Sequence, residues 1–109
     1  MSWDADLVGE IDGHPVHLRG WNYTHNTSRM VYAILRRRET WWGRLNGMTG
    51  LEAQAYLGRI IDSLAADPDK FRAMNPENGW GDYDSFLNVL MEMRAAACKF
   101  PSARWETSG

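Results

Sequence analysis

The sequence has a single cysteine, Cys98, among its 109 residues. One thiol cannot form an internal disulfide or a multi-cysteine zinc site, and chains without disulfides are typical of reducing compartments. No run approaches the roughly 18 apolar residues of a membrane span. Residues 1–6 also lack the basic and apolar segments of a signal peptide. We therefore expect a cytoplasmic protein with no membrane-embedded part.

An excess of positive charge is also missing, because 12 Lys and Arg residues are balanced by 14 Asp and Glu residues, for a net charge of −2. Nonspecific nucleic-acid binding needs a strongly basic surface, so the composition gives no strong nucleic-acid signal. The sequence has no phosphate-binding loop, dinucleotide-binding glycine fingerprint or Gly-x-Ser-x-Gly elbow. We expect no cofactor.

Side chains suited to metal binding or nucleophilic attack are few. His14 and His17 are three residues apart in an expected strand, so they point to opposite faces of a sheet, and His25 falls in another element. Cys98 falls on the apolar face of an expected helix, where it would be an inert small hydrophobe. The sequence predicts no metal site.

An Asp-Gly pair at positions 12 and 13 predicts a β-hairpin over residues 7–22. This dipeptide favours a type I′ turn, and alternating apolar and polar residues flank it. The implied register sets Leu7 opposite Leu18. In this register, four apolar side chains lie on the face expected to pack against the core: Leu7, Ile11, Val16 and Leu18.

Apolar residues recur at helical spacing in four later segments. Thr49 and Glu52 form a capping box before one of them, and Asp82 or Asp84 can cap the last. The alternating tail predicts a third strand beside the hairpin. The chain is thus expected to be one α+β domain, with a small antiparallel sheet packed against three main helices. The expected helices span residues 27–38, 50–66, 68–74 and 84–99, and the strand spans 102–107.

Two polar segments carry most of the side chains suited to recognition. The first, Trp21-Asn22-Tyr23-Thr24-His25-Asn26-Thr27, lies where a strand precedes a helix, and helix N-termini offer free N–H groups. The second, Asn75-Pro76-Glu77-Asn78-Gly79-Trp80-Gly81-Asp82-Tyr83, places an indole between two glycines, which favours its display on a loop. The alternative interpretation is structural: the polar residues cap helices and form turns, and Trp80 packs its loop against the core.

In this order, the two segments resemble small proteins of tailed bacteriophages and their prophages. The shared patterns are Asn-x-Thr-His-Asn and the more specific Asn-Pro-Glu-Asn-Gly-Trp-Gly-x-Tyr, and the resemblance covers residues 21–107. Residues 36–42 and the longer opening hairpin depart from the family pattern. The resemblance implies a phage context and no particular activity.

The leading hypothesis is a non-enzymatic phage-type binding protein that modulates the host. The two segments would converge on one site for a small ligand, of which a nucleotide-like molecule is one example. Asparagine amides would hydrogen-bond to the polar edges of the ligand, and Trp80 or Tyr83 would stack on its ring. Arg29 would pair with a phosphate or carboxylate. The candidate ligand-binding residues are Asn22, Thr24, His25, Asn26, Arg29, Glu77, Asn78, Trp80, Asp82 and Tyr83.

Three alternatives remain open. An inhibitor could bind a host protein through Arg36, Arg37, Arg38, Trp41 and Trp42, because Trp and Arg are enriched at interface hot spots. Residues 40–48 are expected to form a loop, on which the two tryptophans either cover the core or stand on the surface. A small enzyme could use His25 as a base, oriented by Asp82 or Glu77. The protein could also be a homo-oligomer with a site between copies.

Overall fold

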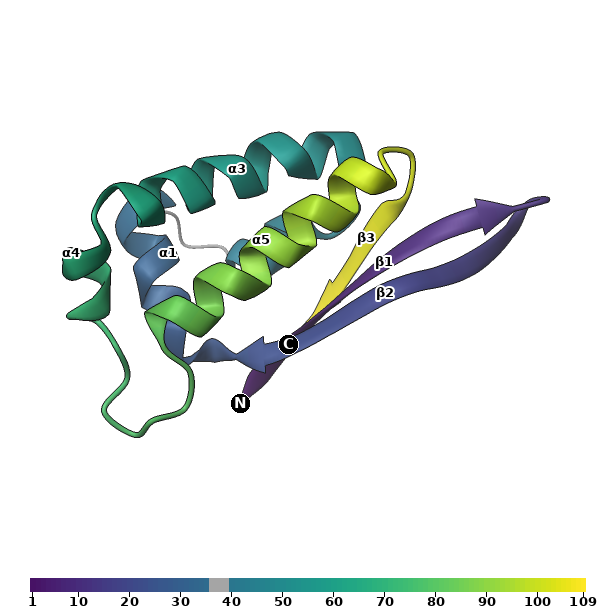
Figure 1. Cartoon of the computed structure of the whole chain (residues 1–109). Helices are drawn as coiled ribbons and strands as arrows, with labels where there is room; N and C mark the ends of the chain where they lie inside the picture. The colour runs from purple at the N-terminus through teal and green to yellow at the C-terminus, as the bar shows by residue number, and fades with distance from the viewer. Residues whose placement is uncertain (36–39) are drawn as a thin grey trace.

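Three antiparallel strands form the sheet: β1 (Ser2–Ile11), β2 (His14–Thr24) and β3 (Arg104–Ser108). The computed structural model describes residues 1–35 and 40–109. The strand order is β2-β1-β3, so the C-terminal strand pairs with the first strand of the hairpin (Figure 1). The expected α+β fold is confirmed. No helix in the described ranges is long and apolar enough to cross a membrane.

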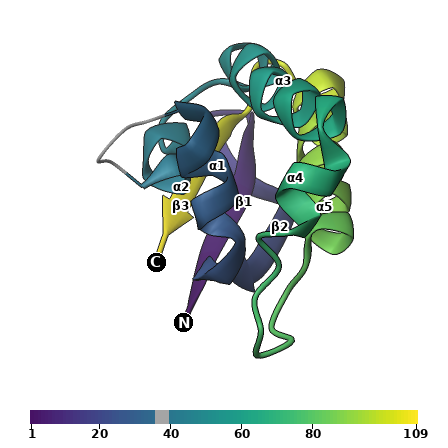
Figure 2. The ribbon, with the colours of Figure 1, turned by 90° about the vertical axis from the view of Figure 1, so that its left-hand side faces the viewer.

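Two long helices, α3 (Gly50–Ala66) and α5 (Tyr83–Lys99), pack side by side over the sheet (Figure 2). Their observed boundaries agree with the predicted ones to within one residue. The capping box before α3 is complete, and the hydrogen bonds that Glu52 accepts from the backbone and side chain of Thr49 lower the pKa of its carboxyl. The start of α3 is therefore determined by local chemistry.

The shorter helices depart more from the sequence prediction. The expected helix over 27–38 is a short 3-10 helix followed by an α-helix that ends at Leu35, and Arg36, Arg37 and Arg38 lie outside the described residues. Residues 40–48, expected to be a loop, contain a helix that Thr40 caps by accepting from the Gly43 N–H. The short elements are η1 (His25–Thr27), α1 (Ser28–Leu35), α2 (Trp41–Leu45) and α4 (Pro68–Arg72).

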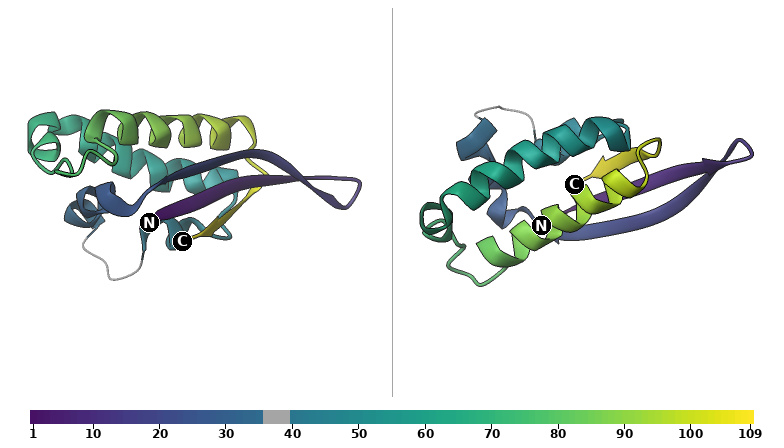
Figure 3. Two further views of the ribbon diagram at one scale, coloured as in Figure 1. Left: turned by 90° about the horizontal axis from the view of Figure 1, so that it is seen from below. Right: turned by 45° about the horizontal axis from the view of Figure 1, so that its top comes forward.

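The hairpin is longer than predicted, and its register changes along its length. An irregularity at Leu7 and Val8 sets Leu7 opposite Arg19, so the expected pair Leu7 and Leu18 is wrong. A bulge inserts one extra residue into a strand, and turn-based register counting cannot detect it. Ile11 was expected in the core but is 62% exposed, because the tip of the hairpin extends beyond the helices (Figure 3).

Tryptophans form the centre of the core. Trp3 contacts Trp41 edge-on, with ring centroids 4.8 Å apart, and Trp41 meets Phe86 at 5.8 Å. Trp41 and Trp42 are both buried, so they cover the core and do not present an interface. The two tryptophans therefore offer no exposed indole to a host protein, and the other residues of that hypothesis, Arg36, Arg37 and Arg38, lie outside the described residues.

The expectation that Cys98 is a small hydrophobe on the apolar face of α5 is wrong. This cysteine is exposed, whereas its neighbour Ala97 is buried against the core. Successive helix positions are rotated by about 100°, so adjacent residues at the margin of a broad apolar stripe can have opposite environments. Cys98 is therefore not a buried hydrophobe.

Candidate functional site

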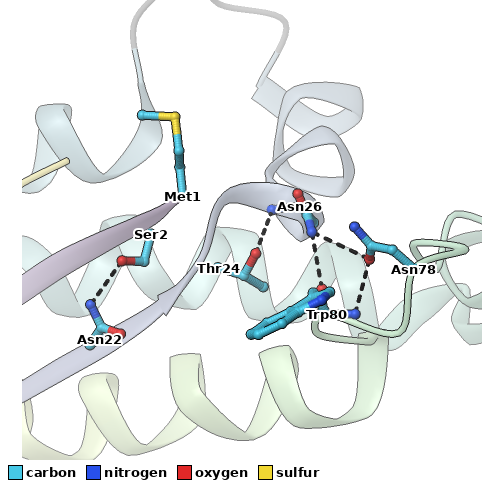
Figure 4. Close-up of a pocket in the computed structure, with 7 residues that line it drawn as sticks. All are labelled: Met1, Ser2, Asn22, Thr24, Asn26, Asn78 and Trp80. Carbon is cyan, nitrogen blue, oxygen red and sulfur yellow. Dashed lines mark hydrogen bonds between the residues drawn. The ribbon is translucent and has the colours of Figure 1, made fainter.

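The two polar segments meet in the folded chain. Asn26 and Asn78, 52 positions apart, are joined by a hydrogen bond of 3.4 Å from Asn26 Nδ2 to Asn78 Oδ1. Asn26 Nδ2 also lies 3.5 Å from the Trp80 carbonyl oxygen, and Asn78 Oδ1 accepts from the Trp80 N–H at 3.0 Å (Figure 4). Residues 21–27 and 75–83 therefore form one surface.

Tyr23 anchors the end of the second segment. Its phenol oxygen lies 2.6 Å from Ser85 Oγ and accepts from the Asp82 N–H at 3.3 Å. The Tyr23 ring also stacks on Phe86, with centroids 5.6 Å apart. Asp82 itself caps α5, because its carboxylate accepts from the Ser85 N–H at 2.8 Å. Asp82 thus has a structural role as the cap of α5.

Arg29 anchors the beginning of the second segment. Its guanidinium donates to the carbonyl oxygens of Met74 and Asn75, the latter at 3.2 Å. Asn75 in turn accepts from the Tyr83 N–H at 2.8 Å through its side-chain oxygen. Arg29 was expected to meet a phosphate or carboxylate. In the structure, backbone carbonyls occupy Nε and Nη2, so Arg29 holds the loop in place.

Beside this junction lies an open hollow of about 500 Å³. The Trp80 indole is 71% exposed and forms one wall, and the side chains of Thr24 and Asn26 lie next to it (Figure 4). Every side chain that lines the hollow is uncharged, which suits a neutral ligand. The lining residues are Met1, Ser2, Asn22, Thr24, Asn26, Asn78 and Trp80.

Two lining residues were missed by the sequence interpretation. Met1 and Ser2 reach the hollow because β1 begins at Ser2 and pairs it with Thr24. Asn22 donates from Nδ2 to Ser2 Oγ at 3.1 Å and to Asp4 Oδ1 at 2.9 Å. The polar and apolar alternation of residues 2–5 could have revealed the earlier start of the strand.

Several expected site residues lie elsewhere. Tyr83 is buried, and its hydroxyl donates to the Leu64 carbonyl oxygen at 2.7 Å, so it cannot stack on a ligand. Burial also raises the pKa of this phenol. Glu77 lines a second hollow together with Arg29, and this hollow shares Asn26 and Asn78 with the first. Of the ten candidate residues, Asn22, Thr24, Asn26, Asn78 and Trp80 line the hollow beside Trp80.

His25 lacks the geometry of a catalytic base. Its ring stacks on Trp42, with centroids 4.6 Å apart and planes 15° apart. Within residues 1–35 and 40–109, its buried Nε2 has no hydrogen-bond partner, so neither Asp82 nor Glu77 orients the ring through this atom. The same part of the chain contains no group of three or more His, Cys, Asp or Glu side chains that could hold a metal ion.

Replacing His25 by phenylalanine is expected to leave the free energy of unfolding unchanged or to raise it by up to about 1 kcal/mol. Phenylalanine keeps the stacked contact with Trp42 and removes a buried nitrogen without a partner among the described residues. Urea denaturation followed by circular dichroism measures the change. A loss above about 2 kcal/mol would show that Nε2 is hydrogen-bonded in solution, contrary to this prediction.

Comparison with known proteins provides no relative from which a function could be transferred. No family model matches the chain, and no curated protein or solved structure shows significant similarity to it. The resemblance of the two polar segments to phage proteins stays a prediction. The hollow beside Trp80 and the contacts that shape it are the features that bear on function.

Proposed function

We propose that this is a non-enzymatic, phage-type binding protein that holds a small planar ligand, such as a nucleobase, against Trp80. One observation carries the proposal: a largely exposed indole and three asparagine amides, from segments far apart in the sequence, line the same hollow. Exposure of an indole forgoes most of the hydrophobic stabilisation that its burial would give, so the native state gains little from this placement of Trp80. A ligand that stacks on the ring would recover that energy.

The chemistry of the lining favours a neutral ring with polar edges. An indole face stacks on any nucleobase, and asparagine amides can donate hydrogen bonds to the edge of the base and accept them from it. Asn22 Nδ2 is already bonded to Ser2 and Asp4, which leaves Asn22 Oδ1 to accept from a ligand. No charged side chain lines the hollow, so a phosphate attached to the ring gains no ion pair with a lining side chain.

The surrounding contacts favour a preformed site. Arg29 fixes the beginning of the 75–83 segment, and Tyr23 fixes its end. The ligand therefore does not have to order a free loop, and this lowers the entropic cost of binding. A rigid site without an oriented base suits recognition rather than turnover. In the proposed phage context, such a protein would modulate the host by sequestering or sensing a small molecule.

The proposal predicts saturable binding of nucleosides that depends on Trp80. Base stacking on an aromatic side chain is worth about 1–3 kcal/mol, so Trp80→Ala is expected to weaken binding by about 5- to 150-fold. Isothermal titration calorimetry with adenosine, guanosine, cytidine and uridine measures the affinities. Each nucleoside is compared with its 5′-monophosphate, and the two are expected to bind about equally.

Two variants serve as controls. Trp80→Phe keeps an aromatic face and is expected to retain most of the affinity. Met91→Ala removes another exposed apolar side chain, one that lines a different hollow, and is expected to change nothing. Absence of saturable binding by all eight compounds would contradict the nucleobase proposal, and so would equal affinities of the wild type and Trp80→Ala.

A further inference from the structure

A second hollow adjoins the hollow beside Trp80. It has a volume of about 640 Å³, and Asn26 and Asn78 line both hollows. These two shared residues are joined by the hydrogen bond between their side-chain amides (Figure 4). A ligand in one hollow can thus extend across the two asparagines into the other. The second hollow is termed the Glu77 hollow, and its other lining residues are Arg29, Ala73, Asn75, Pro76 and Glu77.

The Glu77 hollow is lined by one residue of each charge. Arg29 and Glu77 form no ion pair with each other in the described part of the chain. Arg29 donates from Nε and Nη2 to backbone carbonyls, whereas its Nη1 makes no hydrogen bond within residues 1–35 and 40–109. The exposed Glu77 carboxylate also has no hydrogen-bond partner in these two ranges. One cationic donor and one anionic acceptor are therefore available to a ligand.

This pair of charges favours a ligand group that carries neighbouring hydroxyls. A hydroxyl both donates and accepts, so one hydroxyl can accept from Arg29 while the next donates to Glu77. A phosphate dianion only accepts, and it would be attracted by Arg29 but repelled by Glu77. The chemistry of the Glu77 hollow therefore suits a neutral diol better than an anion.

The stacking surface and the acidic residue are close enough for one small molecule. Glu77 and Trp80 are three positions apart, so their Cα atoms are separated by at most about 11 Å. The Gly79 N–H donates to the Pro76 carbonyl oxygen at 3.4 Å, and this turn shortens the separation further. In a nucleoside the sugar is bonded directly to the base, so a base against Trp80 carries its sugar toward the neighbouring hollow.

We propose that the Glu77 hollow binds the ribose of a ribonucleoside whose base stacks on Trp80. The assignment rests on the proposed function, from which it takes the position of the base. The 2′- and 3′-hydroxyls donate to the Glu77 carboxylate and accept from Arg29 Nη1. A carboxylate binds a ribose hydroxyl in the same way in dinucleotide-binding folds. The protein then distinguishes ribonucleosides from nucleosides that lack the diol.

Removal of the diol tests the assignment. Isothermal titration calorimetry compares adenosine, guanosine, cytidine and uridine with their 2′,3′-dideoxy analogues. Each ribonucleoside that binds is expected to bind about tenfold more tightly than its analogue, because the analogue loses hydrogen bonds to charged groups. Equal affinities that still depend on Trp80 overturn the ribose assignment and leave the base site intact. If none of the nucleosides binds, the base site fails and the ribose assignment fails with it.

A variant without the negative charge tests the role of Glu77. Glu77→Gln keeps the size of the side chain and one acceptor oxygen, so the preference for ribonucleosides is expected to fall from about tenfold to about threefold. The dideoxy analogues are expected to bind the variant and the wild type equally, which separates loss of the ribose contact from damage to the base site. A tenfold preference that survives Glu77→Gln overturns the assignment.

Glu10→Gln is the matched control for this variant. Glu10 is also exposed and forms no ion pair in the part of the chain that the structure describes, but it lies in the hairpin and lines neither of the two hollows. Its substitution is expected to leave the tenfold preference unchanged. An equal fall in the preference for both variants would show that the net charge of the protein, and not contact with Glu77, sets the effect, and this overturns the assignment.

Discussion

Replacing Trp41 by alanine is expected to lower the free energy of unfolding by about 3–5 kcal/mol. The Trp41 side chain is 1% exposed and contacts Trp3 and Phe86. Its Nε1 also donates to Ser28 Oγ at 3.2 Å, so the variant leaves a cavity and a buried hydroxyl without its donor. A domain of this size has a total stability of about 5–15 kcal/mol, so the variant is expected to be close to unfolding.

Urea denaturation of the wild type and Trp41→Ala measures this loss, with Trp80→Ala as the control. The control removes the same side chain from an exposed position, so its free energy of unfolding is expected to stay within about 0.5 kcal/mol of the wild type. Equal losses in the two variants would contradict the burial of Trp41. The comparison also separates a core tryptophan from one available to a ligand.

Replacing Gly81 by alanine is expected to cost about 2–4 kcal/mol and to disrupt the hollow. Gly81 has a φ of +84°, a left-handed conformation in which a β-carbon is strained. A β-carbon there would lie 2.6 Å from Thr24 Cγ2 and 3.1 Å from the Tyr23 oxygen. Both neighbours belong to the 21–27 segment, so the substitution pushes the two polar segments apart.

Gly79→Ala is the matched control for this prediction. Gly79 has a φ of +74°, but a β-carbon at this position would have no neighbour within 4 Å. It is therefore expected to show only the cost of the left-handed backbone, about 1–2 kcal/mol. Thermal and urea denaturation measure both variants, and nucleoside titration measures the site. A loss for Gly79→Ala as large as for Gly81→Ala would show that backbone strain alone, and not contact between the segments, sets the effect.

Elements with local signals could be predicted from the sequence. The Thr49 and Glu52 capping box and the Asp82 cap mark the starts of α3 and α5 closely. Asp12 and Gly13 adopt the positive φ values that the predicted turn requires. In each case, the residues that determine the conformation are within a few positions of one another.

Elements that depend on packing were predicted less well. The helix over residues 41–45 is short and contains a glycine, so its local sequence resembles a loop. Burial of Trp41 and Trp42 stabilises it, and that burial depends on Trp3, far away in the chain. The bulge in the hairpin likewise leaves no mark in the turn sequence, so the pairing of Leu7 with Arg19 was missed. The exposure of Ile11 was missed because it depends on how far the helices reach along the hairpin.

The sequence by itself determined the chemistry of this protein: polar amides, a tryptophan between glycines, and caps that start the long helices. Only the tertiary structure decided which of these groups are free to bind. Arg29, Asp82 and Tyr83 are suited to recognition as residue types, but Arg29 and Tyr83 donate to backbone carbonyls of distant segments, and the Asp82 carboxylate caps α5. Trp80 and the neighbouring amides remain at the surface. The reason is physical: side-chain chemistry is local, whereas the hydrogen-bond partners and burial that occupy a side chain arise from residues far apart in the chain.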